Sequence, residues 1–112
     1  MPPNEDQQIS QAPAHDFRKT ESIAGRRDAR IVQTIYNSMI EVGWKGPPIA
    51  VVEHAGEKYI LNGHHRTYAA RKAGINVPYR IAELSEFGYN SIEEVLIAHA
   101  ESGVNRIRFR QG

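Results

Sequence analysis

The sequence contains no cysteine among its 112 residues. Disulfide bonds, thiolate zinc sites and cysteine nucleophiles are therefore excluded, while the redox compartment stays open, because a chain without cysteine fits any of them. The sequence also lacks an apolar run near the roughly 18 residues that a membrane-spanning helix needs. Its first 17 residues carry acidic side chains where a signal peptide would have an apolar centre. We therefore expect no membrane partner.

The sequence also has no large excess of charge of one sign. It contains 14 Lys and Arg residues and 13 Asp and Glu residues, for a net charge of +1. The pI near 8.1 gives no general preference for a polyanion, so any basic surface must be local. Hydrophobic residues make up 40% of the chain and charged residues 24%, with a mean hydropathy of −0.53. This composition and length are typical of one globular domain with a single core.

The amino-terminal segment is polar, contains three prolines and shows no apolar periodicity. We therefore predict a disordered lead-in or linker over residues 1–16 and a single domain over residues 17–112. Residues 17–27 give no clear pattern. From Asp28, a residue type that caps helices, apolar side chains recur at three and four residues and predict a helix, which two glycines and two prolines end within residues 43–48. Its apolar face comprises Val32, Ile35, Tyr36 and Met39.

A β-hairpin is predicted next, because the β-branched run 49–54 is followed by Ala-Gly and by an alternating segment from residue 57. A second helix is predicted from about His64 to Ala73, ended by Gly74, and a further strand from residue 77. Ser91 and Glu94 form a capping-box pattern that opens a third helix, and the tail 105–110 alternates like a strand. These elements predict an α+β fold with a small mixed sheet and packed helices.

The segment Asn-Gly-His-His-Arg, residues 62–66, lies where the predicted hairpin ends and the second helix begins. The first N–H groups of a helix have no internal partner, and the helix dipole disfavours cations there unless an anion is present. Gly63 allows close backbone approach to a ligand, Arg66 offers a fork of donors to phosphate oxygens, and His64 and His65 suit proton transfer. The pattern therefore predicts a phosphate site that includes Asn62.

Two simpler interpretations of the histidines are a structural role at the helix start and a metal site. A single histidine at a helix start is more often a surface or capping residue, but three adjacent residues that the dipole disfavours are hard to explain by structure alone. Adjacent helical residues point about 100° apart, so the two histidines seldom bind one metal ion together.

Residues 48–81, PIAVVEHAGEKYILNGHHRTYAARKAGINVPYRI, resemble the core of the ParB/sulfiredoxin-like superfamily. This resemblance implies a strand, a hairpin, a Gly-x-x-Arg element that opens a helix, and a following Val-Pro strand. It also implies that nucleotide or phosphate is handled at Gly63, His64, His65 and Arg66. Members of the superfamily include nucleotide-gated DNA-partition clamps, nuclease domains, sulfiredoxins and a free-serine kinase.

Three departures narrow the choice within the superfamily. Sulfiredoxin chemistry needs a cysteine in this motif, and the chain has none. The partition proteins carry a Gly-Glu-Arg-Arg version and continue into a helix-turn-helix reader, for which we expect too little chain after Ile81. The kinase-like Asp-Gly-His-His-Arg version is matched except at Asn62, where a neutral side chain weakens the case for kinase chemistry.

Other candidates lie outside this segment. Glu53, at the end of the first hairpin strand, would serve as a base or a Mg²⁺ ligand if strand pairing brought it to the turn, although an exposed hairpin charge explains it equally well. Arg26 and Arg27 could face phosphate or form a solvated cluster. The tail strand carries Arg106, Arg108 and Arg110, which suit a nucleic-acid backbone or an edge strand protected by charge.

These observations lead to a phosphoester-cleaving enzyme as the leading hypothesis, with a DNA nuclease as its best form and Mg²⁺ and ATP or CTP as candidate cofactors. A nucleoside-triphosphate hydrolase or kinase and a non-catalytic nucleotide-gated module are the alternatives. We expect action in the cytoplasm on nucleic acid or nucleotide. The linker-like start also suggests the toxin domain of a larger secreted effector, with a delivery domain upstream and an immunity partner.

Overall fold

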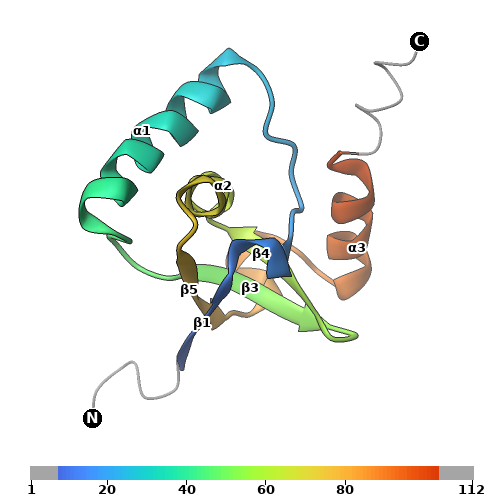
Figure 1. Cartoon of the computed structure of the whole chain (residues 1–112). Helices are drawn as coiled ribbons and strands as arrows, with labels where there is room; N and C mark the ends of the chain where they lie inside the picture. Colours follow the sequence, from blue (N-terminus) through green and yellow to red (C-terminus); the bar gives the residue numbers. More distant parts are fainter. Residues whose placement is uncertain (1–7, 104–112) are drawn as a thin grey trace.

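The computed structural model describes residues 8–103, which form a five-stranded sheet with helices on both faces (Figure 1). The strand order is β1-β5-β3-β4-β2, and the sheet is mixed. Strand β3 pairs antiparallel with β4 and parallel with β5, while β1 pairs antiparallel with β5 and β2 pairs parallel with β4. The strands are β1 (Ile9–Pro13), β2 (Phe17–Arg18), β3 (Ile49–His54), β4 (Glu57–Asn62) and β5 (Asn76–Ile81). The predicted α+β fold with a mixed sheet is confirmed.

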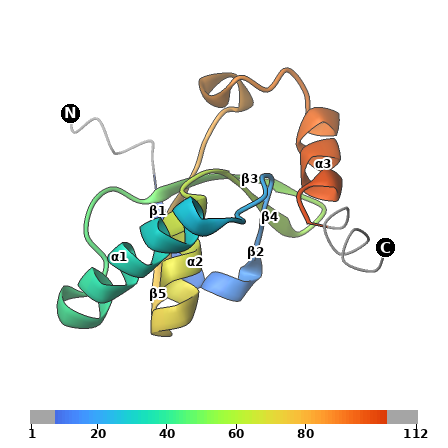
Figure 2. The ribbon, with the colours of Figure 1, turned by 90° about the horizontal axis from the view of Figure 1, so that it is seen from above.

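Three α-helices and two short 3-10 helices complete the domain. They are α1 (Arg26–Val42), α2 (His64–Ala73), α3 (Ile92–Glu101), η2 (Ala14–Asp16) and η3 (Leu84–Phe87). Helices α1 and α2 cover one face of the sheet and α3 covers the other, as the view from above shows (Figure 2). None of the described helices is long and apolar enough to cross a membrane.

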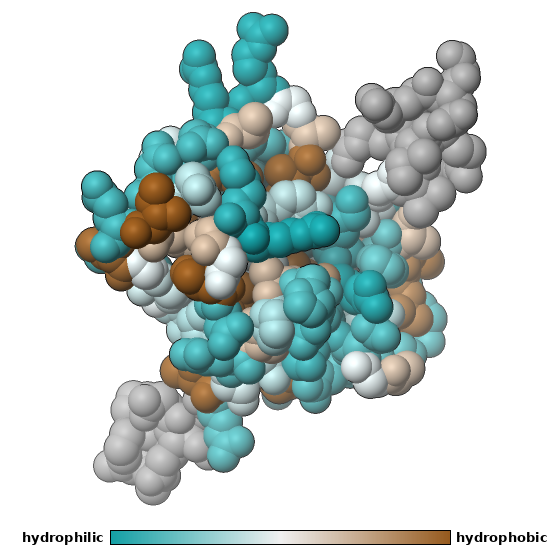
Figure 3. Space-filling model, in the orientation of Figure 1, coloured by the Kyte–Doolittle hydropathy of each residue, from teal (hydrophilic) through white to brown (hydrophobic). Residues whose placement is uncertain are grey.

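The two faces of the sheet follow from the alternation of side chains along its central strands. Ile49, Val51 and Ile60 point into the core beneath α1 and α2, while Ala50 and Leu61 belong to the smaller cluster beneath α3. The predicted apolar face of α1 is confirmed, because its four residues are buried in the first core or packed against it. The exposed apolar residues Ile40 and Val42 lie at the outer end of α1, where Figure 3 shows apolar surface.

Local sequence signals fix several boundaries. The hairpin between β3 and β4 turns at Ala55 and Gly56, which both have positive φ (52° and 82°), the pattern of a tight two-residue hairpin. Helix α2 ends where Gly74 adopts a left-handed conformation. Ser91 caps α3 by accepting from the Glu94 N–H, as predicted, but the Glu94 carboxylate accepts from the Asn90 N–H instead of completing the capping box at Ser91.

Two boundaries differ from the sequence prediction. The expected linker over residues 1–16 is too long, because Ile9–Pro13 forms β1 and pairs with β5 through backbone hydrogen bonds that do not depend on side-chain pattern. Helix α1 begins at Arg26 with Gly25 as its N-cap, so Asp28 is not the cap residue. The predicted tail strand lies outside the described residues.

Candidate functional site

The turn between β4 and α2 is built around Gly63. This residue has a φ of 113°, which favours glycine, and a Cβ there would lie 2.8 Å from the Cβ of Ile49 on β3 and still closer to its methyl group. Gly63 therefore lets the turn lie directly on the central strand, which is a packing reason for glycine rather than the approach of a ligand that we predicted. Helix α2 begins immediately afterwards, and its first bonded amide is Thr67, which donates to the Gly63 carbonyl.

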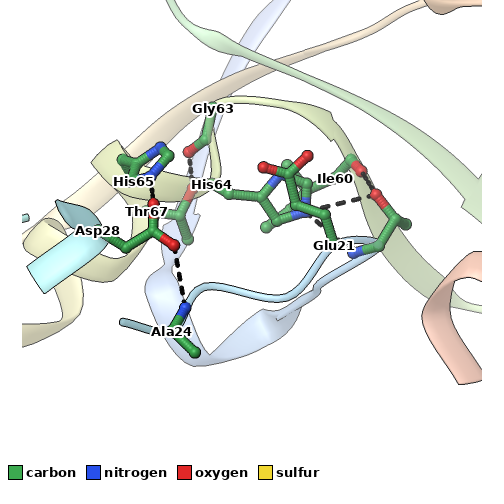
Figure 4. Close-up of polar contacts among 9 residues, drawn as sticks. Glu21, Ala24, Asp28, Ile60, Gly63, His64, His65 and Thr67 are labelled. Atoms are coloured by element: carbon green, nitrogen blue, oxygen red, sulfur yellow. Dashed lines mark hydrogen bonds and ion pairs between the residues drawn. The ribbon is translucent and has the colours of Figure 1, made fainter. Parts of the chain in front are cut away.

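The two histidines that start α2 point in opposite directions (Figure 4). His64 is 4% exposed and points toward the loop before α1, where its Nε2 accepts the Thr20 N–H at 2.9 Å. The Thr20 hydroxyl donates to the Ile60 carbonyl at 2.6 Å, which fixes this loop against β4. Burial lowers the pKa of His64 from 6.5 to about 4, with smaller contributions from His65 and Lys19. His64 is therefore a neutral, buried residue that positions the loop.

His65 turns toward α1, where its Nε2 lies 2.8 Å from Asp28 Oδ1. The second carboxylate oxygen of Asp28 accepts the Ala24 N–H at 3.0 Å, so both oxygens are held. The hydrogen bond from His65 and that from Ala24 lower the pKa of Asp28, which keeps it ionised. An ionised carboxylate only accepts, so Nε2 carries the hydrogen and Nδ1 of the neutral ring has its lone pair available. No hydrogen bond to Nδ1 forms among residues 8–103.

Arg66 is anchored by the loop between α1 and β3. Its Nη1 donates to the Pro47 carbonyl at 2.6 Å, and its guanidinium carbon lies 5.1 Å from the centre of the Trp44 ring. Partial burial lowers the pKa of Arg66 from its usual value, yet a guanidinium stays charged at any ordinary pH. Trp44 also packs against the main core, so it serves both the core edge and the arginine.

The turn lines a shallow pocket of about 210 Å³, which we call the turn pocket. Its lining residues are Glu21, Leu61, Asn62, Gly63, His64, His65 and Arg66. All five positions from Asn62 to Arg66 are among them, and Nδ1 of the buried His64 lies 3.9 Å from a carboxylate oxygen of Glu21. The structure thus brings the predicted residues 62–66 together around one opening.

Glu53 is not part of this site, which corrects the sequence prediction. In the register of the hairpin Glu53 faces Lys58, whereas Asn62, which leads into the turn, faces Ala50 at the start of β3. Asn62 lies four positions along the strand from Lys58, a distance of about 13 Å. The prediction assumed that pairing would bring the end of β3 to the turn, but the hairpin loop and the turn lie at opposite ends of the two strands.

The predicted arginines have different outcomes. Arg26 and Arg27 are exposed on the first turn of α1, next to Asp28, and they do not line the turn pocket. Arg106, Arg108 and Arg110 lie outside the described residues, so their proposed role with nucleic acid stays a prediction.

Sequence reasoning missed two partners of the turn, Asp28 and Thr20. Asp28 carries a sequence signal, its acidic side chain near a helix start, but that signal was interpreted as a cap. Thr20 lies in a segment without pattern and is recognisable only from its contact with His64. Among residues 8–103, no group of three or more His, Asp or Glu side chains lies close enough to hold a metal ion.

No protein-family model and no curated protein sequence matches the chain. Among solved structures, the C-terminally truncated chromosome-partitioning protein ParB from Caulobacter crescentus, complexed with CTP-γ-S, is similar over 81% of this chain, with 26% identity and a TM-score of 0.57. Sulfiredoxin from Arabidopsis thaliana is similar over 68% of this chain and 85% of its own, with 25% identity and a TM-score of 0.54.

The chain has the ParB/sulfiredoxin-like fold. It spans half of the length of the ParB chain that it matches. The resemblance noted from residues 48–81 is therefore confirmed at the level of the superfamily fold, and the Gly-His-His-Arg turn occupies the start of α2 within it.

Proposed function

We propose that this domain binds a nucleotide through its phosphate groups at the turn pocket. The observation that carries the proposal is the uncapped start of α2, where Gly63 makes no side-chain cap and the N–H groups of His64, His65 and Arg66 precede the first intrahelical bond. Such N–H groups and the helix dipole attract anions, and Arg66 adds a permanent positive charge. The similarity to a ParB solved with CTP-γ-S supports a nucleotide as the carrier of the phosphate.

A chemical step is supported by the pairing of His65 with Asp28. In this proposal His65 Nδ1 takes a proton from a water molecule as that water attacks phosphorus, the bond from phosphorus to the leaving oxygen breaks, and the leaving group takes the electron pair. Asp28 holds the ring through Nε2 and stabilises the imidazolium that forms. His64 takes no part, because its Nε2 is occupied by Thr20 and burial keeps it neutral.

Mg²⁺ fits this site only when phosphate oxygens of a bound nucleotide supply some of its ligands. Mg²⁺ commonly keeps several waters and binds one or two carboxylates together with substrate phosphates. The turn pocket offers the Glu21 carboxylate and the Asn62 side-chain oxygen for such an ion. When bound, Mg²⁺ would neutralise charge on the phosphate oxygens.

The substrate is assigned to free nucleotide ahead of DNA. The ParB comparison and the turn pocket support nucleotide, whereas the DNA nuclease hypothesis depends on the three tail arginines outside the described residues. A non-catalytic nucleotide-gated module is the alternative if no turnover occurs. The toxin domain, the delivery domain, the immunity partner and the site of action in the cell stay predictions from sequence.

The proposal is tested by incubating the chain with CTP, ATP and plasmid DNA, each with and without Mg²⁺. We expect release of phosphate from a nucleotide, and expect His65→Ala to lower the rate by about a hundredfold or more, as for loss of a general base. Arg80→Gln is the matched control, because Arg80 is paired with Glu86 on the surface and lines no pocket described here. Nucleotide binding without turnover would identify a binding module. The absence of both binding and turnover would contradict the proposal.

A further inference from the structure

A second and larger pocket, of about 320 Å³, lies between α2, the η2–β2 segment and the end of α3. In Figure 1 the elements that contribute to its lining are the dark blue segment, α2 and α3. We call it the basic pocket. The residues of its lining that matter here are Phe17, Arg18, Lys19, Ile60, Tyr68 and Arg71.

The basic pocket is separate from the turn pocket. Lys19 lines the basic pocket and Glu21 lines the turn pocket, while Thr20 between them is buried against His64. The two pockets share no lining residue. The contact between Thr20 and His64 therefore forms a wall between two openings, and ligands at the two pockets can be distinguished experimentally.

The charge of the basic pocket is positive and partly unbalanced. No acidic residue lines it. Arg18 is paired with Glu57 at 2.9 Å, which neutralises most of its charge. Lys19 and Arg71, in contrast, form no side-chain hydrogen bond or ion pair with any residue from 8 to 103, so two cations border one cavity without a protein anion. A bound anion would satisfy both.

The rest of the lining is mixed, with apolar or aromatic side chains at Ala14, Phe17, Ile60 and Tyr68 and polar ones at His15, Thr67 and His99. Phe17 and Ile60 belong to the main core and form an apolar wall, and Tyr68 adds a ring from α2. His99 is fixed at the border, since its Nδ1–H donates to the Lys19 carbonyl at 2.8 Å. Cations beside an aromatic and apolar surface are the combination that binds nucleotide units, whose base stacks while its phosphate is neutralised. A pocket of this volume lies at the lower end of small-ligand sites, which begin at about 300 Å³.

We propose that the basic pocket binds one nucleotide unit, with its phosphate between Lys19 and Arg71 and its base against the half-buried Tyr68, above the buried side chains of Phe17 and Ile60. This site is independent of the turn pocket and of any chemistry there. A free nucleoside monophosphate and a nucleotide within single-stranded nucleic acid carry the same recognised groups, so both sources are tested.

The test is a titration of the isotopically labelled chain followed by ¹H–¹⁵N NMR, with inorganic phosphate, CMP and a short oligodeoxythymidine as separate probes. We expect CMP or the oligonucleotide to cause saturable shifts in the amides of residues 14–19 and 67–71. Arg71→Gln, an exposed helical position, should weaken this binding about tenfold, as for loss of one charge-assisted hydrogen bond. Arg66→Ala, which alters the turn pocket, and Arg80→Gln, which removes an ion pair outside both pockets, should leave it unchanged.

Tighter binding of the oligonucleotide than of CMP would assign the site to single-stranded nucleic acid, and equal binding would assign it to a free nucleotide. The proposal is overturned if none of the probes gives saturable shifts at these amides, if inorganic phosphate binds as well as CMP, or if Arg71→Gln binds like the native chain. If nucleotides fail to bind at the turn pocket but still shift the amides of the basic pocket, the proposed function is contradicted and the basic-pocket proposal is not.

Discussion

Replacing His64 by glutamine should remove a pH dependence of folding that a buried neutral imidazole produces. His64 is almost fully buried at the start of α2, and its Nε2 accepts the Thr20 N–H. Burial lowers its pKa to about 4, while in the unfolded chain the pKa returns to about 6.5. Glutamine has a similar reach and an acceptor oxygen but does not titrate, so the variant keeps a polar partner for Thr20 and loses only the proton equilibrium.

The sign and size of the effect follow from linkage. Between about pH 6.5 and pH 4 the unfolded state binds a proton at His64 and the folded state does not, so the free energy of unfolding falls as the pH is lowered. One pKa unit corresponds to about 1.4 kcal/mol, so lowering the pH from about 7.5 to about 5 should remove up to about 2 kcal/mol through this group. The carboxylates of Asp28, Glu57 and Glu86, whose pKa values are lowered, contribute below that range.

The assay is urea denaturation of the native chain and of His64→Gln at several pH values between about 5 and 7.5. The unfolding free energy of the native chain minus that of His64→Gln should fall by up to about 2 kcal/mol as the pH is lowered. The other titrating groups are common to both proteins and cancel in this difference. A difference that stays constant with pH would refute the assignment of His64 as a buried neutral residue.

Three further substitutions test the turn and its surroundings. Gly63→Ala should destabilise the domain by roughly 2 kcal/mol or more, because alanine disfavours the positive φ and its Cβ would collide with Ile49; a thermal midpoint equal to that of the native chain would contradict this. Ser91→Ala should cost about 1 kcal/mol through loss of the α3 cap, measured by denaturation, and no loss would show that the cap contributes nothing. Arg66→Lys should weaken nucleotide binding measured by calorimetry, because lysine lacks the planar fork and packs less well on Trp44; equal affinity would show that only the charge matters.

Much of the fold could be predicted because its signals are local. The bounds of α2 agree with the prediction from His64 to Ala73, since a glycine lies at each end. The hairpin is set by Ala55 and Gly56 between two strands that each carry a run of three buried residues. In contrast, β1 has no pattern of its own and is a strand only because β5 offers backbone partners, so sequence alone placed it in a linker.

Part of the candidate site could also be predicted because its residues are local in sequence. Residues 62–66 are contiguous, so their position at a helix start could be predicted from sequence. The assignment of partners could not, because His65 meets Asp28 across 37 residues and Glu53 is separated from the turn by strand register. The buried position of His64 likewise depends on the loop that carries Thr20, which only the tertiary structure brings to it.

Calorimetric titration of CTP into the native chain, with Mg²⁺ present, tests the central claim most directly. The account predicts saturable binding of one nucleotide at the turn pocket, weakened at least about tenfold by Arg66→Ala, as for the loss of a charge-assisted contact with phosphate. The control Arg80→Gln, whose ion pair with Glu86 lies on the surface, should bind like the native chain. Absence of binding for CTP and ATP alike, or native affinity in Arg66→Ala, would contradict a phosphate site at the start of α2.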